Sequence, residues 1–78
     1  MKGAFAMLGK IKLSKIMSRE TKIPYSDVSA YGRYIKHGIN ERLEIGGRTL
    51  SYVGDRLFLV EPDYSHEKIT SKRRAVKL

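Results

Sequence analysis

The chain has 78 residues, of which 16 are lysine or arginine and 8 are aspartate or glutamate, and it contains no cysteine. A chain of this length is expected to form one domain with a thin core, and the lack of cysteine excludes disulfides and thiolate metal sites. The apolar run at residues 4–8 is too short for a membrane span or for the core of a signal peptide. We therefore expect a small cytoplasmic protein without membrane association, metal or cofactor.

The positive charge is concentrated at the two ends of the chain. The net charge is +5 over residues 1–25, zero over residues 26–61 and +3 over residues 62–78. A surplus placed in this way creates a field that attracts polyanions. Nucleic acid, an acidic protein and an anionic membrane surface are the kinds of partner that such a field favours.

The N-terminal part is expected to hold one amphipathic helix. Residues 1–9 are apolar and are compatible with a helical turn, a short strand or an anchoring arm, and the spacing becomes helical from Lys10. The apolar residues on one side of this helix are Leu13, Ile16 and Met17, and the basic residues on another side are Lys12, Lys15, Arg19 and Lys22. The alternative is a short strand over residues 10–13, after which Ser14 caps a helix over residues 15–21.

A second helix is expected over residues 27–37. Pro24 ends the preceding segment, because the residue before a proline avoids helical dihedral angles. Ser26 is in the N-cap position, and Gly38 is in the position that follows a helix C-terminus. The apolar face of this helix consists of Val28, Tyr31 and Ile35. We expect Tyr31 to lie in the core.

Residues 43–60 predict three antiparallel strands joined by two tight hairpins. Gly-Gly at 46–47 and Gly-Asp at 54–55 separate runs of strand-forming residues, as two-residue hairpin loops do. The resulting register collects an apolar face of Leu43, Ile45, Leu50, Tyr52, Leu57 and Leu59. It collects a mixed face of Arg42, Glu44, Thr49, Ser51, Val53, Arg56, Phe58 and Val60. The same register places Arg48 opposite Glu61.

Together these elements predict an α+β fold in which two N-terminal helices pack on a three-stranded antiparallel β-meander. Two helices followed by a hairpin have the order of a winged helix-turn-helix, so we expect a winged-helix-like domain over residues 1–62. Residues 63–78 have little apolar periodicity and are predicted to be a basic flexible tail.

The sequence offers no constellation of residues for catalysis. It has no phosphate-binding glycine loop, and its acidic residues are scattered beside basic neighbours rather than in apolar surroundings that raise a carboxyl pKa. The two histidines are far apart in sequence, and His37 is expected at the surface. We therefore predict a non-enzymatic protein.

Charge and element order favour a DNA-binding accessory or regulatory protein. In a winged helix the second helix enters the major groove, while other elements contact phosphates. The predicted nucleic-acid-binding residues are Lys12, Lys15, Arg19, Lys22, Arg33, Lys36, Arg56, Lys72, Arg73 and Arg74. Arg33 and Lys36 are expected to orient or read the DNA, and the others supply electrostatic affinity. We expect DNA rather than RNA as the ligand.

Part of the chain resembles the S4 type of RNA-binding module. That module has a helix ending in a basic-Gly turn, an apolar-x-apolar-Asn-Gly segment, and a Gly-Asp pair followed by apolar residues. The similar segments here are IKHG at residues 35–38, LEIGG at 43–47 and GDRL at 54–57, with Gly46 in place of the Asn. The resemblance implies structured RNA as an alternative ligand.

An acidic protein is the third candidate partner. Phe58 and Val60 on the mixed sheet face, next to Arg42, combine the aromatic, apolar and arginine side chains that interface centres favour. Small virus- or plasmid-encoded effectors that occupy a host factor dock in this manner. The alternative is that residues 1–9 or the C-terminal tail cover these side chains. Homodimerisation through the same face or through an open edge strand is a further alternative.

Overall fold

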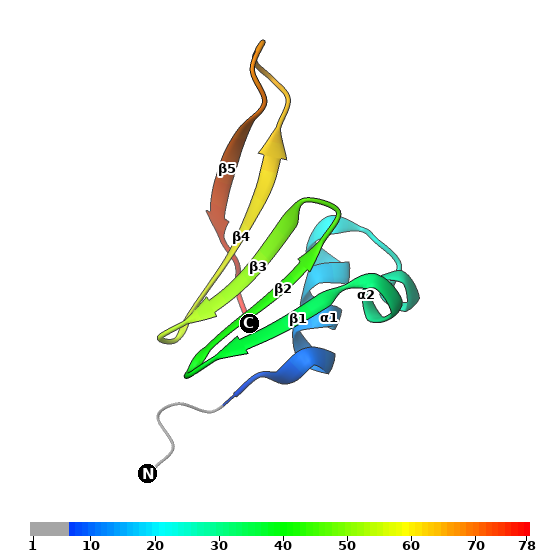
Figure 1. The fold of residues 1–78 in the computed structure, drawn as a ribbon, viewed down its shortest axis with the longest axis vertical. Coiled ribbons are helices and arrows are strands. Elements are labelled where there is room, and N and C mark those ends of the chain that lie inside the picture. Colours follow the sequence, from blue (N-terminus) through cyan, green and yellow to red (C-terminus); the bar gives the residue numbers. More distant parts are fainter. Residues whose placement is uncertain (1–6) are drawn as a thin grey trace.

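The computed structural model describes residues 7–78, which form two helices followed by one five-stranded antiparallel sheet (Figure 1). The strands pair in chain order, so the sheet is a meander. The elements are α1 (Gly9–Thr21), α2 (Tyr25–Tyr31), β1 (Arg33–His37), β2 (Asn40–Ile45), β3 (Arg48–Val53), β4 (Arg56–Asp63) and β5 (Thr70–Ala75). The fold is α+β with two N-terminal helices, but the predicted three-stranded, winged-helix-like arrangement is wrong.

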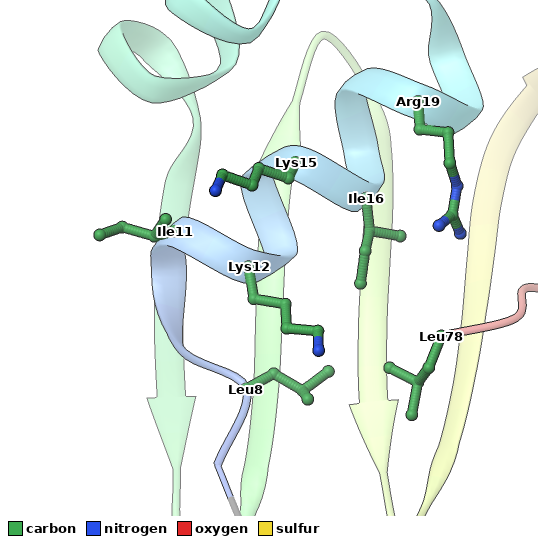
Figure 2. A pocket seen from close by; sticks show the side chains of 7 residues that line it. All are labelled: Leu8, Ile11, Lys12, Lys15, Ile16, Arg19 and Leu78. Carbon is green, nitrogen blue, oxygen red and sulfur yellow. The ribbon is translucent and has the colours of Figure 1, made fainter.

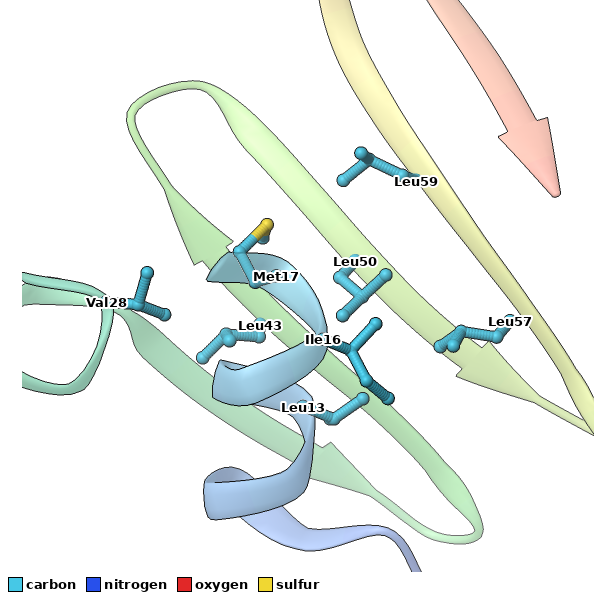
Figure 3. Packing of buried hydrophobic residues seen from close by; sticks show 8 residues of the cluster. All are labelled: Leu13, Ile16, Met17, Val28, Leu43, Leu50, Leu57 and Leu59. Carbon is cyan, nitrogen blue, oxygen red and sulfur yellow. The ribbon is translucent and has the colours of Figure 1, made fainter. Parts of the chain in front are cut away.

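The core lies between α1 and the face of the sheet that α1 covers (Figure 3). Its buried side chains are Leu13, Ile16, Met17, Val28, Leu43, Leu50, Leu57 and Leu59. The helix turns its three apolar residues towards the sheet because residues three and four apart share one helix face. The alternative of a strand over residues 10–13 is wrong, since α1 is continuous from Gly9.

Both hairpin registers predicted from the sequence are confirmed. Leu43 lies opposite Leu50, which in turn lies opposite Leu59. Of the other three predicted core-facing residues, Leu57 is buried, and Ile45 and Tyr52 are partly buried and pack against the core. The predicted charge pair also forms, with Arg48 Nε 3.4 Å from Glu61 Oε2.

The prediction of one helix over residues 27–37 is wrong. Helix α2 ends at Tyr31, and the rest of this segment forms β1, an edge strand that pairs with β2. A Cβ added at Gly32 would collide with the carbonyl oxygen of Val28, which accepts a 2.7 Å hydrogen bond from the Gly32 amide. Gly38 has a φ of +63° and opens a tight turn into β2.

Three expectations change with this strand. Tyr31, which is predicted for the core, is 78% exposed. Arg33 and Lys36 lie on β1 rather than on a recognition helix. Residues 35–38, which resemble the end of a helix in the S4 module, are part of β1 and its turn. An edge of the sheet therefore stands where a winged-helix protein has its recognition helix.

The prediction of a flexible C-terminal tail is also wrong, because β5 pairs with β4 along six positions. Strand β4 continues through Pro62 to Asp63, which lies opposite Thr70. The hairpin of β4 and β5 extends beyond the ends of the other strands (Figure 1). The sheet consequently has five strands, and its second edge is β5.

Besides its pairing with β4, β5 is held by polar contacts and by the residue that follows it, Val76, which packs against the core. Arg74 Nη1 lies 2.6 Å from Glu20 Oε1 on α1, and Arg74 Nε lies 3.8 Å from Glu61 Oε1 on β4. Just after β5, the Val76 amide donates a 2.9 Å hydrogen bond to the Leu57 carbonyl. The sequence of β5, TSKRRA, has no alternating apolar residues, so hydrophobic periodicity does not reveal the strand.

Glu41 of β2 caps the N-terminus of α1. The amides of Leu8 and Gly9 donate hydrogen bonds of 2.9 and 2.7 Å to its two carboxylate oxygens, and the Tyr34 hydroxyl donates a third of 2.8 Å. Amides at a helix N-terminus lack intrahelical acceptors, and an anion there is favoured by the helix dipole. Of residues 1–9, for which the sequence is compatible with a turn, a strand or an arm, Gly9 begins α1 and residues 1–6 lie outside the described residues.

The Glu41 carboxyl stays ionised although it is only 1% exposed. Burial acts to raise the pKa of Glu41, but the three hydrogen bonds and the charge of Lys36 outweigh burial and hold the pKa below its usual 4.5. Burial and the hydrogen bond to Glu41 raise the pKa of Tyr34 to about 12. Glu41 is thus buried, as the sequence does not reveal, but its pKa is not raised.

We expect Glu41→Gln to lower the free energy of unfolding at neutral pH by about 1.5–3 kcal/mol, because it removes hydrogen bonds to a charged acceptor. The folded-state pKa of Glu41 is depressed, so its stabilisation is full above the unfolded pKa and is lost as the pH falls through the folded pKa. Urea denaturation from neutral pH to below pH 4.5 should therefore show the two proteins converging. A constant difference over this range would contradict the role of the ionised carboxylate.

Limited proteolysis distinguishes the β5 strand from a flexible tail. Lys68 lies in the connection between β4 and β5, whereas Lys72 and Arg73 lie within β5. Because cleavage requires a locally unfolded segment, we expect trypsin to cut after Lys68 at least ~10-fold faster than within β5. Mass spectrometry of the fragments over time gives both rates. Equal rates at the three positions would show that β5 is not stably paired.

Candidate nucleic-acid interface

Neither described helix covers the face of the sheet that points away from α1, which we name the open face (Figure 1). The register and the alternation of side chains assign its residues to three rows across the strands. The first row is Arg33, Glu44, Thr49, Val60 and Arg73. The second row is Ile35, Arg42, Ser51, Phe58 and Ala75. The third row is His37, Asn40, Val53 and Arg56.

The open face carries a surplus of arginine. Its arginines come from four of the five strands and are Arg33, Arg42, Arg56 and Arg73. The register places one carboxylate, Glu44, in the three rows. Arg42 Nη1 lies 3.9 Å from Glu44 Oε2, and the Arg42 side chain remains 56% exposed. The open face has a net positive charge because its four arginines outnumber its one carboxylate, and so exposed an ion pair is weak and leaves Arg42 accessible.

Phe58 is the aromatic residue of the open face and is partly buried. The guanidinium carbon of Arg73 lies 4.5 Å from the centre of its ring. This contact brings the C-terminal segment onto Phe58, which is one of the alternatives that the sequence leaves open. A guanidinium stacked on an aromatic ring is a flat cationic surface, suited to a second planar group or a phosphate.

The structure divides the predicted binding residues between the two sides of the sheet. Three of the predicted nucleic-acid-binding residues lie on the open face and are Arg33, Arg56 and Arg73. They share this face with the residues predicted to bind a protein partner, which are Arg42, Phe58 and Val60. The remaining predicted residues belong to the helix-covered side and are Lys12, Lys15, Arg19, Lys22, Lys36, Lys72 and Arg74.

Several cations on the helix-covered side have structural roles. Hydrogen bonds from Arg74 and then Arg19 lower the pKa of Glu20, which joins β5 to α1. Lys36 lies opposite Glu41 and contributes to its lowered pKa. The cations that border a groove along α1 are Lys12, Lys15 and Arg19. The charged residues of the sequence therefore do not form one continuous binding surface.

Sequence reasoning missed the extent of the open face. Ile35 belongs to it because residues 33–37 form a strand, and the signal for that strand is the Gly38 turn. The stacking of Arg73 on Phe58 depends on the pairing of β5 with β4, which brings together residues distant in sequence. The sequence predicts only the central part of this interface, because two glycine hairpin loops indicate the pairing of β2, β3 and β4.

Neither helix within residues 7–78 is long and apolar enough to cross a membrane. In the same part of the chain, no three histidine, aspartate or glutamate side chains are grouped in a way that holds a metal ion. The sequence matches no protein-family model, no curated protein and no solved structure. The open face is therefore interpreted from its own chemistry.

Proposed function

We propose that this chain is a small, non-enzymatic accessory or regulatory protein that binds single-stranded nucleic acid on the open face of its sheet. DNA is the preferred ligand in this proposal. The observation that carries the proposal is the spread of four arginines over this face around a partly buried phenylalanine. Proteins that bind single strands combine a cationic surface for the backbone with an aromatic surface on which bases stack. A reducing cytoplasm suits the chain, since it has no cysteine.

The dimensions of the open face favour a single strand over a duplex. Neighbouring strands are ~4.8 Å apart, so five strands make a face about 19 Å wide, whereas the DNA major groove is about 12 Å wide. The face is too wide to enter the groove, and a duplex lying across it would present only phosphates. A single strand can instead lie along the rows and turn its bases towards the sheet.

The residues of the open face are proposed to act in two ways. The exposed guanidinium groups, which belong to Arg33, Arg42 and Arg56, bind phosphate oxygens. The stacked pair of Arg73 and Phe58 supplies a planar surface for a base. This arrangement implies little sequence preference, because every base has a face that can stack.

Fluorescence anisotropy with labelled single-stranded DNA, single-stranded RNA, structured RNA and duplex DNA tests this proposal at ~50 and ~200 mM salt. We expect single-stranded DNA to bind most tightly at both salt concentrations. Removing one arginine that binds a phosphate should flatten the dependence of log K on log salt by ~0.7 for a single strand. Tighter binding of the duplex at the higher salt would contradict binding on the open face.

Two matched variants locate the binding site. Replacing Arg33, Arg42 and Arg56 together by glutamine should flatten the salt slope by about 2, if each arginine holds one phosphate. Replacing Lys10, Lys12 and Lys15 by glutamine removes the same charge from α1. This change should leave most of the dependence of log K on log salt unaltered. Similar losses of affinity in both variants would assign the binding to net charge alone.

Phe58→Leu tests base stacking separately from phosphate binding. Leucine keeps an apolar side chain at this partly buried position but removes the aromatic ring. We expect affinity for single-stranded DNA to fall by about 5- to 150-fold, which corresponds to the ~1–3 kcal/mol typical of one stacked base. The salt slope should not change, because the arginines that bind phosphates are all retained. An unchanged affinity in a folded variant would exclude stacking on Phe58.

A further inference from the structure

A second surface lies on the other side of the sheet, where a groove of about 600 Å³ runs between α1 and Leu78 (Figure 2). Its apolar lining consists of Leu8, Ile11, Ile16 and Leu78, and its basic lining consists of Lys12, Lys15 and Arg19. Figure 2 shows Lys12 reaching between Leu8 and Leu78, while Arg19 lies at the far end. The groove therefore has apolar walls with cations along its length.

The apolar part of this groove is unusually open to solvent. Ile11 is 66% exposed and Leu78 is 57% exposed. The chain has no structural need for Ile11, because α1 packs on the sheet through Leu13, Ile16 and Met17. Exposed apolar side chains that line one groove together with cations are typical of sites that bind another molecule.

The charged side chains of the groove have one sign. Its lining includes three cationic side chains and no acidic side chain. Arg19 is held in place, since its Nη2 donates a 2.6 Å hydrogen bond to the Lys77 carbonyl and its Nε lies 3.0 Å from Glu20. Lys12 and Lys15 form no ion pair within residues 7–78. The two lysines are thus available to an anionic partner.

We propose that this groove binds an acidic amphipathic segment of another protein, with apolar side chains in the groove and carboxylates on Lys12 and Lys15. An amphipathic helix in an apolar groove is a common mode of peptide recognition, and complementary charge fixes its orientation. A nucleic-acid backbone matches the lysines but leaves Ile11 and Leu78 uncovered. The site is independent of the proposed function because it lies on the opposite side of the sheet from the open face.

The test uses the full ¹⁵N-labelled chain and a designed peptide of about four helical turns, in which leucines recur at helical spacing among glutamates. The control peptide has the same composition in an order that gives no apolar face. We expect the amphipathic peptide to bind at least ~10-fold more tightly. NMR amide shifts should concentrate on residues 8–19 and near Leu78. Shifts concentrated on the open face, or equal affinities of the two peptides, would overturn the proposal.

Variants on one helix separate the groove from general charge. Lys12→Glu with Lys15→Glu should weaken peptide binding at least ~10-fold, whereas Lys10→Glu with Lys22→Glu, which makes the same change in net charge outside the groove, should weaken it less than ~3-fold. Ile11→Ser should weaken binding without unfolding the chain, since this side chain is mostly exposed. Equal effects of the two charge variants would overturn the proposal.

A second copy of the chain is the other candidate occupant of the groove. Sedimentation tests this alternative directly, because it measures the oligomeric state of the chain. If the groove is a dimer interface, the free chain sediments as a dimer, Ile11→Ser makes it monomeric, and the peptide competes with the second copy. That result would overturn the assignment to an acidic segment. A monomeric chain that binds the amphipathic peptide supports it.

Discussion

The hydrogen bonds of Glu41 are the constraint on which the rest of the structure depends. This buried carboxylate on β2 accepts hydrogen bonds from the first amides of α1 and from the hydroxyl of Tyr34 on β1. It therefore connects one helix and two strands. The helix has no side-chain cap of its own at Leu8. Because Glu41 fixes where α1 starts, it also fixes which helix residues face the sheet. The apolar side of α1 is thereby buried, and its lysines remain on the surface.

Alternation along the strands then sorts the positive charge of the chain into two separate surfaces. On β5, neighbouring basic residues point to opposite sides of the sheet, so Arg73 stacks on Phe58 on the open face while Arg74 pairs with Glu20 on the helix-covered side. One run of basic residues in the sequence thus supplies both a candidate ligand contact and a structural ion pair. A high net charge is compatible with two different kinds of binding in one small domain.

The central strands of the sheet are predicted with the correct register. Strands β2 to β4 combine glycine loops with alternating apolar residues, so a shift of one residue would disrupt both. The wrong helix over residues 27–37 arises because Gly38 fits a helix end as well as a hairpin turn. Strand β5 and the Glu41 cap have no local signal, since their partners lie on distant elements. The open face depends on β1 and β5, so only its central part is predictable.

The most direct test of the central claim is an NMR titration of the ¹⁵N-labelled chain with a single-stranded DNA oligonucleotide. Binding on the open face predicts the largest amide shifts at open-face positions on several strands, including Arg33, Arg42, Phe58 and Arg73, with little change along α1. Shifts concentrated at Lys12 and Lys15, with an unchanged open face, would contradict the claim and would place the nucleic acid on the helix side of the sheet.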